Sequence, residues 1–241
     1  LNKINKAQSE NQLRMSTGLR INKAEDDAAG YSIATKLNSR VAGLEQALSN
    51  VGDAKSVLDI AEASYGSIMD NLIEMKGLAT QAANDTLGAD ERSYIGDQIQ
   101  ALGNDVNEVA DQTIFQDTEL LNGDAGSYSG TLSLNFQVGE RSTDTLSASL
   151  EVVNINELFD VSGITNITMN TNVGEGGTQG SIVFNSNIDG ESGDDATAAD
   201  FRSFLDAVDG AIGNMNDRVN DIGMAQSSLS TREVTLSQSI S

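Results

Sequence analysis

The strongest pattern in this chain of 241 residues is a seven-residue repeat of apolar positions between Leu37 and about Ala83. Because an a/d repeat sustained over this length is typical of coiled coils, it predicts one long helix whose alanine-rich seam lets another helix approach closely. The repeat consists of two apolar series three residues apart: Leu44, Val51, Leu58, Tyr65, Leu72 and Ala79, and Ala47, Ala54, Ala61, Ile68, Met75 and Ala82.

Two further helices are expected on either side of the chain's middle. Residues 84–88 are a break, and Asp90 and Glu91 then place acidic side chains where a helix begins. The second helix carries Ile95, Ile99, Leu102, Val106 and Val109 and should fold back antiparallel. Near the C-terminus a third helix repeats the heptad spacing, and we expect it to pack on the first. Its unbroken series is Phe201, Val208, Met215, Ile222, Leu229 and Leu236, and a second series of Leu205, Ile212 and Val219 accompanies it until Gln226 and Glu233 interrupt that second series.

Between these helices the apolar residues alternate with a period of two, which indicates strands. The turn-like stretch 139–144 separates two such runs and predicts a β-hairpin: Leu132, Leu134, Phe136 and Val138, then Leu146, Ala148, Leu150 and Val152. Residues 163–195 are rich in Gly, Asn, Thr and Asp, and we interpret them as a weaker β-ribbon projecting from the helices. The predicted fold is therefore mainly α with β, an elongated antiparallel bundle of two N-terminal helices and one C-terminal helix, with a β-hairpin and a small outer ribbon.

Composition narrows the classes of function. The chain carries 36 acidic and 14 basic residues, a net charge of −22, which argues against binding nucleic acid or an anionic membrane surface. No apolar run reaches transmembrane length, and no signal-peptide core is present. The 4% aromatic content and the absence of Trp favour close helix packing over a ligand pocket.

The chain also lacks Cys, His and Pro. Without Cys there is no disulfide, and without Cys and His the sequence predicts no zinc, haem or iron–sulfur site, so we expect no metal and no cofactor. Without His, no His-assisted nucleophile can be assembled, so we do not expect an enzyme. The missing Pro removes slow X-Pro isomerisation, which suits a chain that travels unfolded and folds quickly on arrival.

Three local motifs invite a chemical interpretation, but each has a plainer one. Asp26 and Asp27 are paired carboxylates, yet beside Arg20 and Lys23 they favour ion pairs and subunit contacts. Residues 185–190 resemble the start of a calcium loop, but the twelfth position is Ala196, which cannot ligate. The tripeptides at 84–86 and 166–168 fit the N-glycosylation pattern, which occurs often by chance.

Residues 15–30, reading MSTGLRINKAEDDAAG, resemble the N-terminal signature of the bacterial flagellins. Further similar stretches follow in the family's order at 71–84, 112–123, 136–139 and 218–229. The resemblance implies that the signature residues make subunit contacts in a filament: Gly18, Leu19, Arg20, Ile21, Asn22, Asp26, Asp27 and Gly30.

The resemblance also implies an architecture and a location. Residues 1–36 would be an N-terminal helix and signature connector, 37–153 the N-terminal arm of a rod domain with its hairpin, 154–195 a small variable outer β region, and 196–241 the C-terminal helix of the rod. The protein would be an extracellular filament subunit for swimming, exported unfolded by the flagellar type III system, with an export chaperone and a cap protein as partners. Family members have further segments at both ends that drive polymerisation, so we expect this chain alone to stay largely monomeric.

One stretch resembles the flagellin segment that Toll-like receptor 5 binds and that overlaps an axial subunit contact. At the position of the family's leading Arg this chain has Glu74, and a helical Glu of the family is replaced by Gly77. An unmatched charge at an interface centre costs several kcal/mol, so we expect weak or absent receptor activation. The equivalent positions are Leu72, Glu74, Met75, Lys76, Leu78, Gln81 and Gln98.

Two other functions stay open at this point. A hook–filament junction protein shares the helical arms, although the long signature match favours the filament subunit. A surface-displayed module that binds a glycan or a host protein is the other, but the ribbon offers only Phe184 as an aromatic platform.

Overall fold

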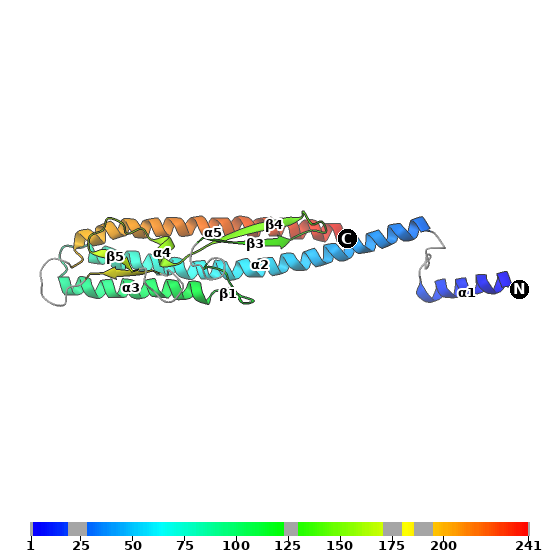
Figure 1. The fold of residues 1–241 in the computed structure, drawn as a ribbon, viewed down its shortest axis with the longest axis horizontal. Helices are drawn as coiled ribbons and strands as arrows, with labels where there is room; N and C mark the ends of the chain where they lie inside the picture. The colour runs from blue at the N-terminus through cyan, green and yellow to red at the C-terminus, as the bar shows by residue number, and fades with distance from the viewer. Residues whose placement is uncertain (1, 19–27, 123–129, 171–179, 186–194, 241) are drawn as a thin grey trace. The chain divides into compact units, whose positions relative to one another are not determined.

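The computed structural model describes residues 2–18, 28–122, 130–170, 180–185 and 195–240. Helices begin and end the described chain, and short antiparallel strand pairs and one short helix lie between them in the sequence (Figure 1). In chain order the elements are α1 (Asn2–Thr17), α2 (Ala28–Ala82), α3 (Ala89–Gln112), β1 (Ile114–Phe115), β2 (Thr118–Glu119), β3 (Thr131–Gln137), β4 (Thr145–Glu151), α4 (Ile155–Leu158), β5 (Ile167–Asn170), β6 (Ser181–Phe184) and α5 (Ala198–Ile240).

The chain divides into two compact units. The smaller comprises Leu1–Val51, Gln137–Thr145 and Arg232–Ser241, and the larger comprises Gly52–Phe136 and Leu146–Thr231.

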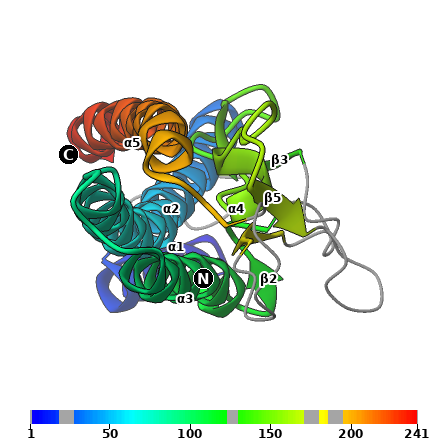
Figure 2. The same ribbon diagram turned by 90° about the vertical axis from the view of Figure 1, so that its left-hand side faces the viewer.

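In the larger unit, α2 and α5 are antiparallel neighbours, as the heptad repeats predict (Figure 2). Lys76 of α2 meets Asp209 of α5, whereas further back along α2 Glu62 accepts a hydrogen bond from Gln226. The seam between them is closed to solvent, and its members on both helices are at most 2% exposed: Leu58, Ala61, Tyr65, Ile68, Leu72, Met75, Val208, Met215, Ile222 and Leu229. The predicted packing of two segments far apart in the sequence is confirmed.

Helix α3 folds back along the other side of α2, as predicted. At the connection, the Nε of Arg92 donates a hydrogen bond of 3.1 Å to the carbonyl of Ala82. At the far end, the hydroxyl of Thr113 lies 2.8 Å from that of Ser64, which fixes the antiparallel direction. The predicted apolar positions Ile95, Ile99 and Val106 are buried, because the helix turns this face toward α2.

The predicted hairpin is present as the pair β3–β4. Its inward face carries Leu132, Ala148 and Leu150, each under 9% exposed. A smaller hairpin, β1–β2, was not expected from the sequence. Its turn residues Gln116 and Asp117 have φ values of 46° and 63°, so both adopt the left-handed conformation.

The outer ribbon differs from our expectation, because its described strands do not project. Strand β5 pairs antiparallel with β6, with Ile167 opposite Phe184. Phe184 stacks on Phe201 at 5.1 Å and meets Phe204 edge-on at 5.3 Å. Ile182 is fully buried. The strands pack on the helices because projecting would leave these apolar side chains in water; residues 171–179 and 186–194 lie outside the described residues.

In the smaller unit, the turn of the β3–β4 hairpin lies against α2. Arg40 pairs with Glu140 at 2.9 Å, and the amide of Asn50 donates to the carbonyl of Gln137 at 3.1 Å. Gly43 allows this approach, since a Cβ there would lie 3.3 Å from Glu140. Helix α1 ends at Gly18, whose φ of +70° and 2.9 Å hydrogen bond to the carbonyl of Arg14 form a left-handed C-cap.

Candidate functional site

The residues predicted to contact the receptor or an axial neighbour fall into two groups, buried and exposed, according to the face of the helix on which each lies. Leu72 and Met75 are fully buried in the seam, so their side chains cannot reach a partner. Leu78 is half-buried. The side chains exposed to a partner are Glu74, Lys76, Gln81 and Gln98. A contact surface on α2 and α3 is therefore smaller and more polar than the predicted set.

Lys76 already has a partner within its own chain. Its ammonium lies 2.5 Å from the Asp209 carboxylate, and the two side chains are 46% and 54% exposed. Ion pairs at such exposure contribute about 0–1 kcal/mol to the stability of the fold. This pair therefore links α2 to α5 only weakly, and Lys76 can still change partners. Glu74 is exposed two residues earlier and presents a carboxylate to whatever approaches this face.

The signature residues lie only partly within the described chain. Gly18 is the C-cap of α1, and Gly30 is half-buried in the first turn of α2. The remaining predicted contact residues lie outside the described residues: Leu19, Arg20, Ile21, Asn22, Asp26 and Asp27. Asn187, Asp189 and Gly190 of the calcium-loop pattern also lie outside them.

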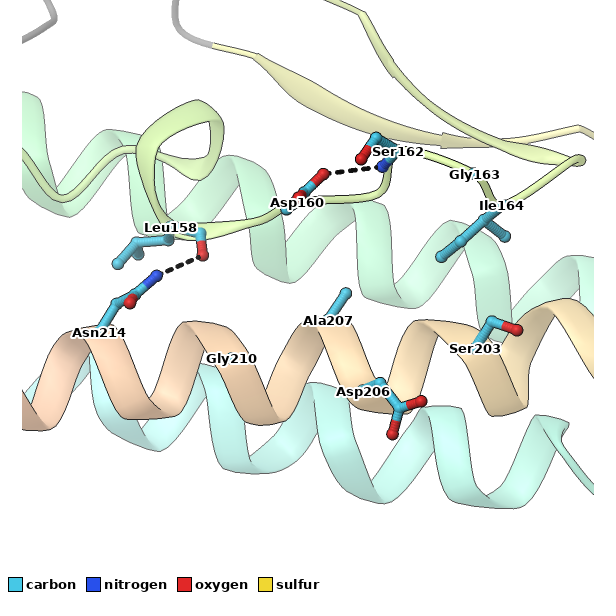
Figure 3. A pocket seen from close by; sticks show the side chains of 10 residues that line it. All are labelled: Leu158, Asp160, Ser162, Gly163, Ile164, Ser203, Asp206, Ala207, Gly210 and Asn214. Carbon is cyan, nitrogen blue, oxygen red and sulfur yellow. Dashed lines mark hydrogen bonds between the residues drawn. The ribbon is translucent and has the colours of Figure 1, made fainter.

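An open groove of about 400 Å³ runs between α5 and the segment 158–164 (Figure 3). Asn214 donates a hydrogen bond of 3.3 Å to the Leu158 carbonyl and closes one end. Hydrogen bonds from Ser162 lower the pKa of Asp160, which therefore stays ionised. Asp206 lies on the α5 side. The groove brings together carboxylates, hydroxyls and an amide, but no paired acid and base suited to catalysis.

The Tyr65 hydroxyl has a strongly shifted pKa, and the main cause is its burial. Burial raises the pKa of Tyr65, the neighbouring Arg218 lowers it, and burial prevails. Arg218 itself is 8% exposed, and its Nε lies 3.5 Å from Glu151. Tyr65, Arg218 and Glu151 thus bring α2, α5 and β4 together at one buried position.

Asn107 was missed by the sequence analysis although it organises three elements. Its amide donates a 2.9 Å hydrogen bond to the carbonyl of Gly180, and its oxygen accepts a 3.0 Å bond from the backbone N–H of Ile155. The available signal was a polar residue on the inward face of α3, four positions after Gly103 and three before Ala110, both of which are buried.

The described residues contain no group of three or more His, Cys, Asp or Glu side chains placed to hold a metal ion. Within the same residues, none of the helices is both long and apolar enough to cross a membrane.

Comparison with known proteins gives one family. Residues 1–125 match the bacterial flagellin N-terminal helical region. Polar flagellin A of Vibrio parahaemolyticus is 34% identical over 150 residues, which cover 62% of this chain and 38% of that protein. The chain thus spans about two fifths of the length of this curated relative.

Solved structures share the fold. The crystal structure of Bacillus cereus flagellin covers 78% of this chain and 88% of its own, with a TM-score of 0.55 and 22% identity. A Vibrio parahaemolyticus structure described as a flagellar hook-associated protein covers 90% and 95%, with a TM-score of 0.65 and 14% identity. At these identities the likeness is one of fold alone.

Proposed function

The chain belongs to the bacterial flagellin family, and on this basis we propose that it is a structural subunit of an extracellular flagellar filament that drives swimming. The observation that carries the proposal is the use of the heptad seams. The apolar residues of these seams are buried within the chain where α2 packs on α5. The outer faces of α2 and α3 are mostly polar and exposed, so they can contact other subunits. A filament subunit needs self-complementary surfaces and no catalytic centre.

Finer assignments follow from the family. We propose export in the unfolded state through the flagellar type III system, with a chaperone and a cap protein as partners. We also propose the domain division at residues 36, 153 and 195, with 154–195 as the part that varies among relatives. The docking of β6 on the helices supports a compact form of that region.

The rival function is that of a hook–filament junction protein, since a solved structure described as hook-associated has the same fold as this chain. The two functions differ in what the subunit builds, since a junction protein joins two structures and a filament subunit polymerises without limit. The glycan-binding alternative gains no support, because Phe184 is half-buried and stacked on Phe201.

A chimera tests the filament role. The stretch of polar flagellin A that matches this chain is replaced by the corresponding residues, and the product is expressed in a strain without its own flagellins. We expect filaments by electron microscopy. Unmodified polar flagellin A is the control and should form filaments in the same strain. If the chimera is exported and helical but forms no filaments, the proposal is wrong. If it forms only short caps at the hook, the junction protein is favoured.

We further propose that Toll-like receptor 5 responds weakly to this chain because Glu74 is exposed where related flagellins carry Arg. A groove that accepts a guanidinium would be left with unpaired acceptors facing a carboxylate.

The test is Glu74→Arg in a receptor-reporter cell assay. The matched control is Glu45→Arg, which makes the same charge change at another exposed position of α2. We expect at least a tenfold gain in potency for Glu74→Arg alone, about the effect of one charged contact. A full response from the unmodified chain at ordinary flagellin doses would contradict this proposal.

A further inference from the structure

Helix α3 carries a large negative charge that its own segment does not balance. It contains six acidic residues and one basic residue, Arg92. The Nε and Nη2 of Arg92 donate hydrogen bonds of 3.1 Å to the carbonyls of Ala82 and Asn84, so this guanidinium is held at the end of α2. Residues 93–140 contain no Lys or Arg. The carboxylates along the rest of α3 therefore have no basic residue of the same segment to offset them.

The second half of α3 holds three of these acidic residues. Asp105 and Glu108 are exposed, and Asp111 follows three residues later. Residues three apart are neighbours on a helix, so like charges at this spacing repel each other. The negative end of the helix dipole also disfavours carboxylates near the C-terminus, and the last turn has no basic residue to counter either effect. This half of α3 is therefore electrostatically unfavourable in dilute salt.

A short apolar face holds α3 on α2. Its buried apolar side chains are Ile95, Ile99, Val106 and Ala110. Among the described residues, no side-chain hydrogen bond caps the N-terminus of the helix at Gly88. The α2–α5 seam is longer, because the heptad series of both helices is buried along it. Elements with fewer buried contacts open at a lower cost in free energy, so α3 should open before the seam.

Hydrogen bonds between neutral groups also attach α3 to its neighbours. The Asn107 amide donates to the carbonyl of Gly180 at 2.9 Å, and its oxygen accepts from the N–H of Ile155 at 3.0 Å. The hydroxyl of Thr113 lies 2.8 Å from that of Ser64 on α2. These contacts form only when α3 is docked, and salt screens charges rather than neutral hydrogen bonds. Salt therefore acts on the docking of α3 through its carboxylates.

We propose that α3 is an ionic-strength-sensitive element, which separates from α2 in dilute salt while the α2–α5 seam stays closed. Exposed charges interact over about 30 Å at 0.01 M ionic strength but only over about 10 Å at 0.1 M. Repulsion among the α3 carboxylates therefore opposes docking mainly in dilute solution. The opening exposes the apolar face of α3 and breaks its contacts with α4 and β6. The inference goes beyond the proposed filament role and does not rest on it.

Hydrogen exchange of the 241-residue chain, followed by mass spectrometry at ionic strengths of about 0.02 M and 0.5 M, tests the opening. We expect the amides of α3 to exchange about tenfold faster at the lower value, while those of the α2–α5 seam change by less than about twofold. An equal change throughout the chain would indicate general charge repulsion and overturn the proposal. Exchange in α3 that is the same at both ionic strengths would overturn it as well.

Charge reversal shows whether the carboxylates of α3 are responsible. In D105K/E108K the second half of the helix gains basic residues, so the dependence of α3 exchange on salt should fall from about tenfold to about twofold. The matched control D217K/D221K makes the same charge change at exposed positions of α5 and should leave the tenfold dependence of α3 in place. A control that suppresses this dependence as strongly as D105K/E108K would assign the effect to net charge and overturn the proposal.

Circular dichroism at the higher ionic strength establishes that each variant folds. If a reversal prevents folding, D105N/E108Q and D217N/D221N take the place of the two charge-reversed chains. Neutralisation removes the repulsion without adding attraction, so the dependence of α3 exchange on salt should fall to about threefold in D105N/E108Q alone. The same dependence in both neutralised chains would contradict the assignment to α3.

Discussion

At the scale of single residues, the turn between β1 and β2 stores conformational strain. Gln116 and Asp117 both have positive φ, as in a type I′ turn, which Asn-Gly adopts with little cost. We predict that Gln116→Asn with Asp117→Gly stabilises the larger unit by about 1 kcal/mol, because each side chain now pays for a left-handed backbone. Urea denaturation measures the change. Asp117→Ala is the control and should destabilise; a double variant that loses stability would show that the turn is unstrained.

The first turn of α5 carries a pH-sensitive cap. The N–H of Thr197 donates to Asp200 at 2.8 Å, the N–H of Asp200 lies 3.3 Å from the Thr197 hydroxyl, and Asn166 donates to the same carboxylate at 3.1 Å. Partial burial raises the pKa of Asp200, but the hydrogen bonds from Thr197 and Asn166 together prevail and hold it below its usual value.

A lowered pKa in the folded state means that the carboxylate stabilises the fold above its unfolded pKa, and that this contribution is lost as pH falls through the folded pKa. We predict that Asp200→Asn costs about 0.5–1 kcal/mol at pH 7, as expected for a helix cap. The difference from wild type should shrink as pH falls below the ordinary pKa of an aspartate, and vanish once pH has fallen through the lowered folded-state pKa of Asp200. Thermal unfolding followed from pH 7 into acid tests this; a deficit that persists where the carboxyl is protonated would assign the effect to packing.

At the scale of elements, the docking of β6 on α3 depends on a close approach. A Cβ at Gly96 would lie 3.0 Å from the Phe184 side chain, tighter than an ordinary contact, so Phe184 would have to shift. We predict that Gly96→Ala destabilises the larger unit by about 1–3 kcal/mol, because Phe184 must leave its stack on Phe201. Hydrogen exchange should then increase in β5 and β6.

A matched substitution elsewhere has the opposite expected sign. At Gly66, on the exposed face of α2, an added Cβ meets nothing within 4 Å. Gly66→Ala should therefore stabilise by about 0.5–1 kcal/mol through helix propensity. Equal effects at both positions would contradict the close-approach argument.

The sequence predicts well those elements that are long enough for their apolar pattern to repeat several times. Heptads in α2 and α5 fix both their type and their buried face, and alternation fixes β3 and β4. The two-residue strands β1 and β2 are too short to show a period. Periodicity also identifies a buried face without identifying its partner, which is why the packing of Phe184 on Phe201 was not predicted.

At the scale of the whole molecule, the candidate contact surface illustrates the same distinction. Leu72 and Met75 belong to the heptad series that predicts burial, so the sequence already contained the reason to remove them from a list of surface contacts. A family resemblance assigns the same contact role to every residue of a matching segment. The position of each residue around the helix, however, decides which side chains face outward. Asn107, by contrast, needs the positions of α4 and β6, which no local pattern supplies.

The chain-wide absence of Pro has a kinetic consequence. Slow refolding phases of small proteins, lasting tens of seconds, come from X-Pro bonds that isomerise in the unfolded state. This chain has none, so all its molecules should refold without such a phase, although its length of 241 residues requires packing between segments far apart. Stopped-flow refolding from urea should finish without a phase of tens of seconds, and a prolyl isomerase should not change its rate. A slow phase that the isomerase leaves unchanged would place the delay in the pairing of α2 with α5, and would weaken the argument that this composition suits a chain folding at its destination.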